Sequence, residues 1–283
     1  MNGELEIEAD PRFNALARLY GREGLAKLAG ARVLIVGIGG VGSWVAEALA
    51  RSGVGQITLT DMDEVCVTNV NRQVHATSKT VGQPKIGAMA ARILEISPAC
   101  RVEEAFCFFG EATADSLLGR PWEVVVDAID SIPHKCLLLA ECVRRKIPVV
   151  TVGGAGGRRD PSRVQVVDLT RTYDDPLLQR VRKKLRQKHG FPRNTRKTWR
   201  IPAVFSPEPV MFPQQDGTVC AVREAGVNLR LDCASGYGTA AFVTGTFGFA
   251  AAAAAVERIL LSSPSSADRD NALIHSNDGS PCT

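Results

Sequence analysis

Short β-branched runs alternate with amphipathic stretches along most of the chain. The runs predict buried strands, and the stretches between them predict helices. Strands are expected at 32–37, 56–61, 102–106, 123–128, 147–152 and 163–169, and helices at 41–52, 85–96, 133–145 and 176–188. Strands that alternate with helices favour right-handed crossovers. The predicted fold class is therefore α/β, with a Rossmann-like, doubly wound, mostly parallel sheet.

The pattern also divides the chain into regions. Residues 1–30 are expected to form an N-terminal helical arm, and residues 31–261 the main domain. A basic insert is expected at about 176–216, where residues 192–216 are proline-rich and irregular. A C-terminal extension holds one more long helix, and the Ser/Pro/Asp-rich residues 262–283 are expected to be a disordered tail.

The long helix contains an uncharged stretch, Ala234 to Val256, which is long enough to cross a membrane. It consists mostly of Ala, Gly, Thr and Phe, which membrane insertion rewards weakly, so a buried helix is favoured over a membrane segment. The first ten residues are polar and lack an apolar export signal. A cytoplasmic location is therefore expected. The eight cysteines include no C-x-x-C pair, so neither a zinc site nor a disulfide scaffold is predicted.

A glycine-rich turn joins the first strand to the following helix. It carries Gly37, Gly39, Gly40 and Gly42. Bare glycines let the backbone approach phosphates, and the start of a helix supplies N–H donors and partial positive charge. Asp61 ends the next strand about 20 residues later, where a carboxylate can accept ribose hydroxyls. This pattern predicts a nucleotide site and does not choose between ATP and NAD.

Polar and charged residues crowd the chain after the second strand: Asp61, Asp63, Asn69, Arg72, Gln73 and Lys85. Hydride transfer needs no such set, whereas Arg72 and Lys85 could clamp a triphosphate and neutralise departing pyrophosphate. Asp127 and Asp130 follow a later strand at the edge where open α/β sheets bind ligands. Asp130 is the predicted Mg²⁺ ligand. Each charge taken alone would more often be a solvated surface group.

These motifs resemble the ubiquitin-activating-type adenylating enzymes in order and spacing: G-x-G-G-x-G, D-x-D, N-x-N-R-Q, Q-P-K and D-x-x-D. The resemblance implies binding of ATP and Mg²⁺ and adenylation of a carboxylate. It assigns those roles to Gly37–Gly42, Asp61, Asn69, Arg72, Lys85 and Asp130. It also implies a homodimer in which an arginine near the N-terminus of the neighbouring subunit reaches the phosphates. Arg18 is the candidate for that arginine, with Arg12 as an alternative.

Further segments narrow the resemblance to one branch of this family: Ala17–Gly21, Asp61–Thr68, Gly153–Gly157, Phe205–Ser206 and Asp232–Gly236. They resemble the tRNA threonylcarbamoyladenosine dehydratases. The resemblance implies ATP-dependent cyclisation of threonylcarbamoyladenosine at position 37 of tRNA. The alternatives are a sulfur-carrier adenylyltransferase, which usually holds two C-x-x-C pairs, a sulfur-trafficking partner of a cysteine desulfurase, and an NAD-dependent oxidoreductase.

A run from Arg180 to Arg200 is rich in Lys and Arg and contains no acidic residue. Such a run neutralises phosphates and predicts contact with RNA, although a solvated helix face would give the same pattern. The aromatic side chains of Trp199 and Phe191 are candidates for stacking an unpaired base. The predicted RNA-binding residues are Arg180, Arg182, Lys183, Lys184, Arg186, Lys188, Arg196 and Lys197.

Cys233 lies where sulfur-carrier activators keep a thiol that accepts the activated acyl group. A nucleophilic role and a simply buried role both remain open for it. His75 and His134 are expected to be structural.

Overall fold

The computed structural model describes residues 10–194, 197–222 and 238–262. Its main sheet has seven strands in the order β3-β2-β1-β4-β5-β7-β6. All neighbouring strands are parallel except β6, which runs antiparallel to β7. The strands are β1 (Arg32–Val36), β2 (Gln56–Thr60), β3 (Arg101–Ala105), β4 (Val124–Asp127), β5 (Val149–Val152), β6 (Gln165–Asp168) and β7 (Pro202–Phe205). The predicted α/β, doubly wound, mostly parallel architecture is confirmed.

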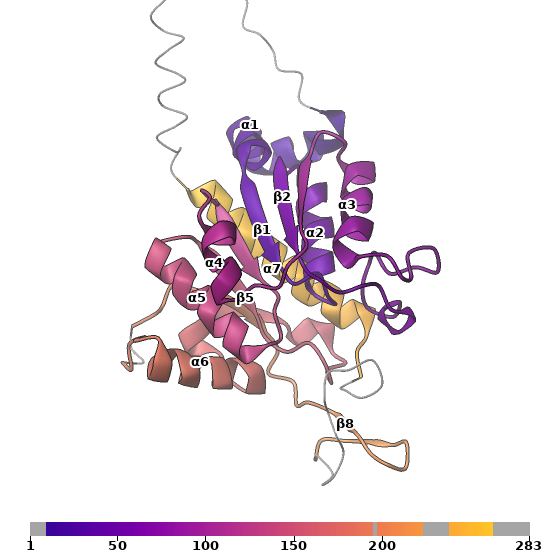
Figure 1. The fold of residues 1–283 in the computed structure, drawn as a ribbon, viewed down its shortest axis with the longest axis vertical. Coiled ribbons are helices and arrows are strands. Elements are labelled where there is room, and N and C mark those ends of the chain that lie inside the picture. The colour runs from indigo at the N-terminus through magenta and orange to yellow at the C-terminus, as the bar shows by residue number, and fades with distance from the viewer. Residues whose placement is uncertain (1–9, 195–196, 223–237, 263–283) are drawn as a thin grey trace, which may run out of the picture.

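Helices cover both faces of the sheet (Figure 1). One face carries α1 (Asn14–Gly30), α2 (Gly42–Arg51), α3 (Lys85–Ile96) and α7 (Ala241–Leu261). The other carries α4 (Glu111–Leu118), α5 (Ile132–Arg145) and α6 (Pro176–Lys188). Alternation along β1 explains the two cores, because Val33 and Ile35 belong to the first and Leu34 and Val36 to the second.

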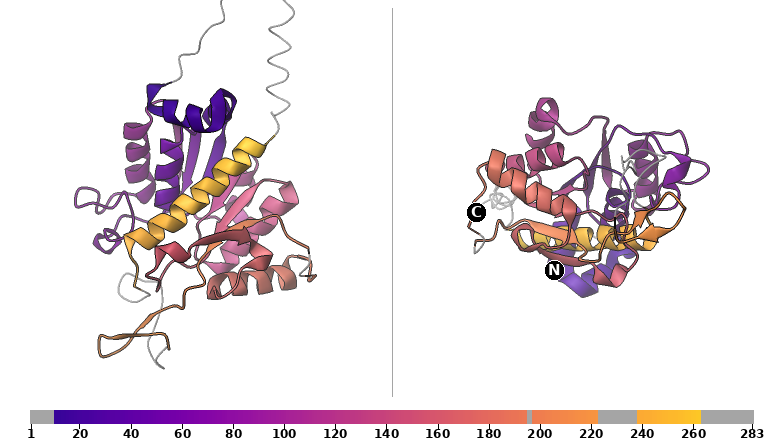
Figure 2. Two further views of the ribbon diagram at one scale, coloured as in Figure 1. Left: turned by 180° about the vertical axis from the view of Figure 1, so that it is seen from behind. Right: turned by 90° about the horizontal axis from the view of Figure 1, so that it is seen from below.

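The predicted buried helix near the C-terminus is α7, which crosses one face of the sheet diagonally (Figure 2). By length and composition it is a helix that could span a membrane. Most of its side chains are nevertheless buried against α2 and the central strands, including Val243, Phe247, Ala251 and Ala255. The structure thus agrees with the prediction of a buried core helix.

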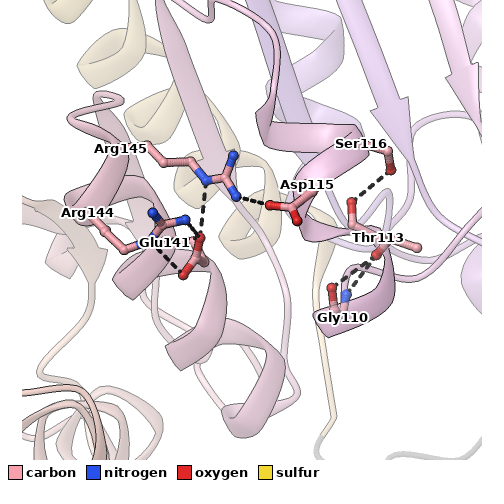
Figure 3. A network of polar contacts seen from close by, with 7 residues as sticks. All are labelled: Gly110, Thr113, Asp115, Ser116, Glu141, Arg144 and Arg145. Carbon is pink, nitrogen blue, oxygen red and sulfur yellow. Dashed lines mark hydrogen bonds and ion pairs between the residues drawn. The ribbon is translucent and has the colours of Figure 1, made fainter.

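Two predictions about the elements were incomplete. The short helix α4 was not predicted, and its side chain Asp115 accepts a hydrogen bond from Arg145 of α5 (Figure 3). Arg145 also donates to Glu141, at 3.1 Å, so one guanidinium joins the two helices. Strand β7 lies within the segment predicted to be an irregular insert, but it pairs with both β5 and β6. Residues 202–205 therefore belong to the main sheet. A small hairpin, β8 (Phe212–Pro213) with β9 (Val219–Cys220), follows them.

Candidate active site

The glycine-rich turn is closely packed at two of its glycines. Gly37 has a φ of +91°, and a Cβ atom there would lie 2.9 Å from the carbonyl oxygen of Ala128. A Cβ at Gly42 would lie 1.8 Å from the carbonyl oxygen of Gly37, so the turn closes only without side chains at these positions. Gly39 differs, since a Cβ there would meet no atom within 4 Å. The backbone at Gly39 therefore faces open space at the start of α2.

Asp61 holds this turn from the end of β2. Its carboxylate accepts hydrogen bonds from the backbone N–H groups of Ile38, at 2.7 Å, and Asp63, at 2.9 Å. The residue is 8% exposed. A carboxylate has about four lone-pair positions. Asp61 thus organises the turn and keeps acceptor capacity for the ribose hydroxyls predicted to bind it.

Arg72 lies directly over the turn. Its side-chain Cδ is 3.5 Å from the position of a Cβ at Gly40, and its guanidinium donates to the carbonyl of Thr68 at 2.6 Å. The indole N–H of Trp44 donates to the carbonyl oxygen of Arg72 at 2.9 Å and so ties this segment to α2. The structure therefore places a positive charge beside the predicted phosphate site.

Lys85 and Asp63 form an ion pair next to Asp61. The ammonium of Lys85 donates to Asp63 at 2.6 Å, and the Lys85 backbone N–H donates to the Asp63 carbonyl at 2.9 Å. Lys85 is 7% exposed, whereas the Asp63 side chain is half exposed. An incoming anion can therefore compete with Asp63 for a lysine that already lies at the edge of the site.

Asn69 and Gln73 are buried and shape the segment that carries Arg72. The side-chain oxygen of Asn69 accepts the Cys66 N–H at 3.0 Å, and its backbone carbonyl accepts the N–H groups of Arg72 and Gln73. The side-chain oxygen of Gln73 has no hydrogen-bond partner among the described residues. Asn69 therefore already makes structural hydrogen bonds within one chain. Its predicted contact with a nucleotide would be made in addition to them.

Two aspartates follow β4 in contrasting surroundings. Asp130 is exposed, and Asp127 is fully buried against Lys135, whose ammonium lies 2.8 Å from it. Burial raises the pKa of Asp127, and Lys135 and the hydrogen bond from Thr151 oppose that rise. The sequence offered no signal for Lys135, because a lysine in a helix is ordinarily expected to face solvent.

The described residues around Asp130 do not form a metal site made of protein ligands alone. In the described parts of the chain, no group of three or more His, Cys, Asp and Glu side chains could hold a metal ion. Mg²⁺ is commonly bound by one or two carboxylates together with substrate phosphates and water. Asp130 is exposed and follows Ala128 and Ile129, and Ala128 contacts the phosphate turn, so the loop that carries this carboxylate begins beside the turn.

Arg18 lies outside this site within one chain. It is exposed on α1, which packs at the opposite, amino edge of the sheet (Figure 1). Phe13 near the start of α1 contacts Gly53, and Ala29 near its end contacts Gly55, just before β2. Arg12 pairs with Asp10 at 2.8 Å. An arginine from this region could reach the site only from another subunit.

The glycine-rich segment Gly153–Gly157, which follows β5, is joined to α6 by the buried carboxylate of Asp175. Asp175 caps α6 through the N–H of Leu178, at 2.9 Å, and accepts the N–H of Gly154, at 3.0 Å. The guanidinium of Arg158 lies 3.5 Å from the same carboxylate. Arg158 is 2% exposed, and burial lowers its pKa. The basic helix and the carboxyl edge of the sheet thus share a single anchoring group.

The basic segment divides into an outer and an inner set. Arg182 donates to the Thr172 hydroxyl, and the Arg186 guanidinium lies 5.2 Å from the centre of the Trp199 ring. Both arginines are half-buried, as is Lys184. Arg180, Lys183, Lys188 and Lys197 are exposed, and Arg196 lies outside the described residues. The outer set is the part of this segment that can meet a partner directly.

The expected base-stacking role of Trp199 and Phe191 is wrong for this structure. Trp199 is 9% and Phe191 8% exposed. Their rings pack edge to face, with centroids 4.7 Å apart, in the core beneath α6. They support the basic helix from within and present no face to a base. Cys233 lies outside the described residues, so its role stays a prediction.

Comparison with known proteins leads to the same family as the motifs in the sequence. The ThiF family model matches residues 13–276. The chain is 48% identical over 250 residues to the tRNA threonylcarbamoyladenosine dehydratase of Escherichia coli K12, covering 88% of this chain and 93% of that protein. It is 43% identical over 251 residues to the Haemophilus influenzae enzyme of the same name, covering 89% and 94%. The crystal structure of the E. coli dehydratase TcdA in complex with ATP superposes with a TM-score of 0.78 at 43% identity, covering 88% and 93%.

Proposed function

Since the chain belongs to the ThiF family, and within it to the tRNA threonylcarbamoyladenosine dehydratases, we propose that it uses ATP to cyclise threonylcarbamoyladenosine at position 37 of tRNA. The observation that carries the proposal is the convergence of three groups on one glycine turn. Asp61 binds the turn, Arg72 lies over Gly40, and the Lys85–Asp63 pair lies beside them. In an NAD-dependent oxidoreductase, Arg72 and Lys85 would have no role in the reaction.

In the proposed reaction, the threonine carboxylate attacks the α-phosphorus of ATP and pyrophosphate leaves. The start of α2 and the Gly39 backbone would bind the phosphates, and Asp61 the ribose. Arg72 and Lys85 would stabilise the negative charge that develops on the leaving group. Asp130 would hold Mg²⁺, which supplies further charge neutralisation when it is bound with the nucleotide.

The second step closes the ring. The carbamoyl group of the same substrate attacks the adenylated carbonyl, and the bond to AMP breaks. One carboxylate oxygen leaves with AMP and the attacking carbamoyl group releases a proton to solvent, so the nucleoside loses the elements of water. Because attacking group and carbonyl belong to one molecule, no second substrate has to be bound.

The direct test incubates the protein with ATP, Mg²⁺ and threonylcarbamoyl-modified tRNA, followed by digestion and mass analysis of the nucleosides. The expected product is lighter than the substrate nucleoside by one water. Arg72→Ala and Lys85→Ala should each lower the rate roughly 10²-fold or more, the scale for loss of one preorganised charge-stabilising group. Lys79→Ala is the matched control, because Lys79 is an exposed lysine of the same loop. Equal rates for all variants would contradict the phosphate-clamp roles.

We further propose that the exposed side chains of α6 bind tRNA phosphates. Replacing Arg180, Lys183 and Lys188 with Ala should weaken tRNA binding and reduce the slope of log affinity against log salt by about one for each lost contact. ATP affinity should stay unchanged. Arg101→Ala, at an exposed arginine on the edge strand β3, controls for loss of charge. A wild-type salt slope in the triple variant would move the RNA surface elsewhere.

The remaining proposals concern the oligomeric state, the reaction class, the location and the protein partners. A homodimer is supported by large apolar side chains exposed along α7, Phe242 at 59% and Phe249 at 50%. In such a dimer, Arg18 of one subunit would reach the phosphates of the other. We also place the enzyme among ATP-dependent ligases and in the cytoplasm, with cysteine desulfurase or sulfur-acceptor proteins as further partners.

A further inference from the structure

The strongest unassigned feature is the fully buried ion pair at the end of β4. Asp127 and Lys135 are both 0% exposed, and their charged groups lie 2.8 Å apart. The same Asp127 oxygen accepts the Thr151 hydroxyl at 2.6 Å. The proposed reaction uses neither charge, because neither group can touch a substrate from inside the core.

Both partners bind the residue that precedes Asp130. The other Asp127 oxygen accepts the backbone N–H of Ile129 at 3.1 Å, and the Lys135 ammonium donates to the Ile129 carbonyl at 2.8 Å. Ile129 is thus held through both of its own backbone polar groups. The carbonyl of Ile129 belongs to the peptide bond between Ile129 and Asp130. The hydrogen bond from Lys135 therefore fixes the orientation of the peptide group that precedes Asp130.

The next residues fix Asp130 from its other side. Ser131 is the N-cap residue of α5, and its carbonyl accepts the backbone N–H of Lys135 at 2.9 Å. The Ser131 hydroxyl lies 2.9 Å from the ring Nδ1 of His134. Lys135 therefore contacts the chain on both sides of Asp130, through its side chain at Ile129 and through its backbone at Ser131.

A buried ion pair often stabilises a core no better than well-packed apolar residues of similar volume, because both charges must be removed from water. A pair that also clamps one loop residue supplies directional contacts that apolar side chains cannot. The loop in question carries Asp130 at its tip and Ala128 at its base. Ala128 in turn contacts Gly37 of the phosphate turn.

We propose that Asp127 and Lys135 are positioning residues that orient Asp130 toward a metal bound with the nucleotide. The inference rests on the metal role of Asp130 proposed above. Lys135→Met alone would leave a buried carboxylate unpaired and could prevent folding. The double variant Asp127→Asn/Lys135→Met avoids that problem. It removes both charges and the ammonium that holds the Ile129 carbonyl.

The test measures metal binding directly. Mn²⁺ is titrated into the protein with a non-hydrolysable ATP analogue, and free Mn²⁺ is followed by electron paramagnetic resonance. The double variant should bind Mn²⁺ about 10-fold more weakly or worse, the effect typical of losing a group that orients a metal ligand. Affinity for the analogue without metal should stay near wild type. Glu47→Gln is the matched control, because it removes another buried ion-paired carboxylate, in α2.

Two outcomes would overturn the inference, and Asp130→Asn separates them. If Asp130→Asn weakens Mn²⁺ binding while the double variant behaves like Glu47→Gln, the pair is only structural and the metal role of Asp130 survives. If Asp130→Asn itself binds Mn²⁺ as wild type does, the metal role of Asp130 fails and the positioning role fails with it.

Discussion

Acidification should destabilise this protein through His75. The residue is 2% exposed, and neither ring nitrogen has a hydrogen-bond partner among the described residues. Burial, with the nearby charges of Lys85 and Arg92, lowers the pKa of His75 from 6.5 to about 4. The folded protein therefore keeps His75 neutral, while the unfolded chain takes up a proton below about pH 6.5.

The size of the effect follows from linkage. Between pH 6.5 and 4 the unfolded state binds one more proton at this site than the folded state, so the free energy of unfolding falls as pH falls. The window spans roughly 2.5 pH units at about 1.4 kcal/mol per unit, which sets an upper limit of about 3.5 kcal/mol. Between pH 7 and pH 4 the change is about 3 kcal/mol, because proton uptake is only partial near each pKa. That is a large share of the roughly 5–15 kcal/mol that stabilises a typical domain.

The assay is urea unfolding at several pH values between 4 and 8, for wild type and for His75→Leu. The variant loses no hydrogen bond to the described residues and cannot take up the proton. Its free energy of unfolding should exceed that of wild type by a margin that grows by about 3 kcal/mol from pH 7 to pH 4. His134→Gln controls for replacement of an exposed histidine. Parallel curves for wild type and His75→Leu would refute the reasoning.

Three further predictions concern other sites. Gly39→Ala should fold as well as wild type, since its methyl meets open space, yet bind ATP roughly tenfold or more weakly because that methyl lies where phosphates approach; Gly42→Ala should instead lose about 1–3 kcal/mol or more of stability in urea unfolding. Asp175→Ala should cost about 3–5 kcal/mol, because it leaves Arg158 buried without its carboxylate, and Asp175→Asn should cost less because it keeps the helix cap. Cys233→Ala should slow but not abolish single-turnover cyclisation, since intramolecular attack reaches effective molarities of about 10⁵ to 10⁸ M; a thioester trapped in wild type, with adenylate accumulating in the variant, would make Cys233 the nucleophile.

The sequence predicted the sheet where its signals were strong and missed elements where they were weak. The strand and helix around the glycine turn followed from an apolar run, a glycine motif and a periodic helix. The helix α4 is eight residues long and lacks a clear apolar stripe, so its pattern did not stand out. The four-residue strand β7 begins with a proline, which argued against a strand although its carboxyl half is wholly buried.

The site was predicted to the extent that it depends on chain order. Parallel strands end at one edge of the sheet, which is why Asp61 and Asp130 could be placed near the phosphate turn from the sequence. Side-chain direction could not be predicted in the same way. Trp199 stands in a basic segment, and a sequence does not show whether an aromatic ring there faces outward to RNA or inward to Phe191. Lys135 escaped notice for the same reason.

The position of α7 has a consequence for how this protein is made. The helix packs against β4, β5 and β7 and against α2 and α1, yet among the described elements it is synthesised last. Until residues 241–261 leave the ribosome, Val126, Val150 and Val204 of three central strands lack their cover. Domains generally fold as units, and exposed apolar strands favour aggregation. A chain released before residue 241 would therefore be a substrate for chaperones and proteases rather than a smaller working enzyme.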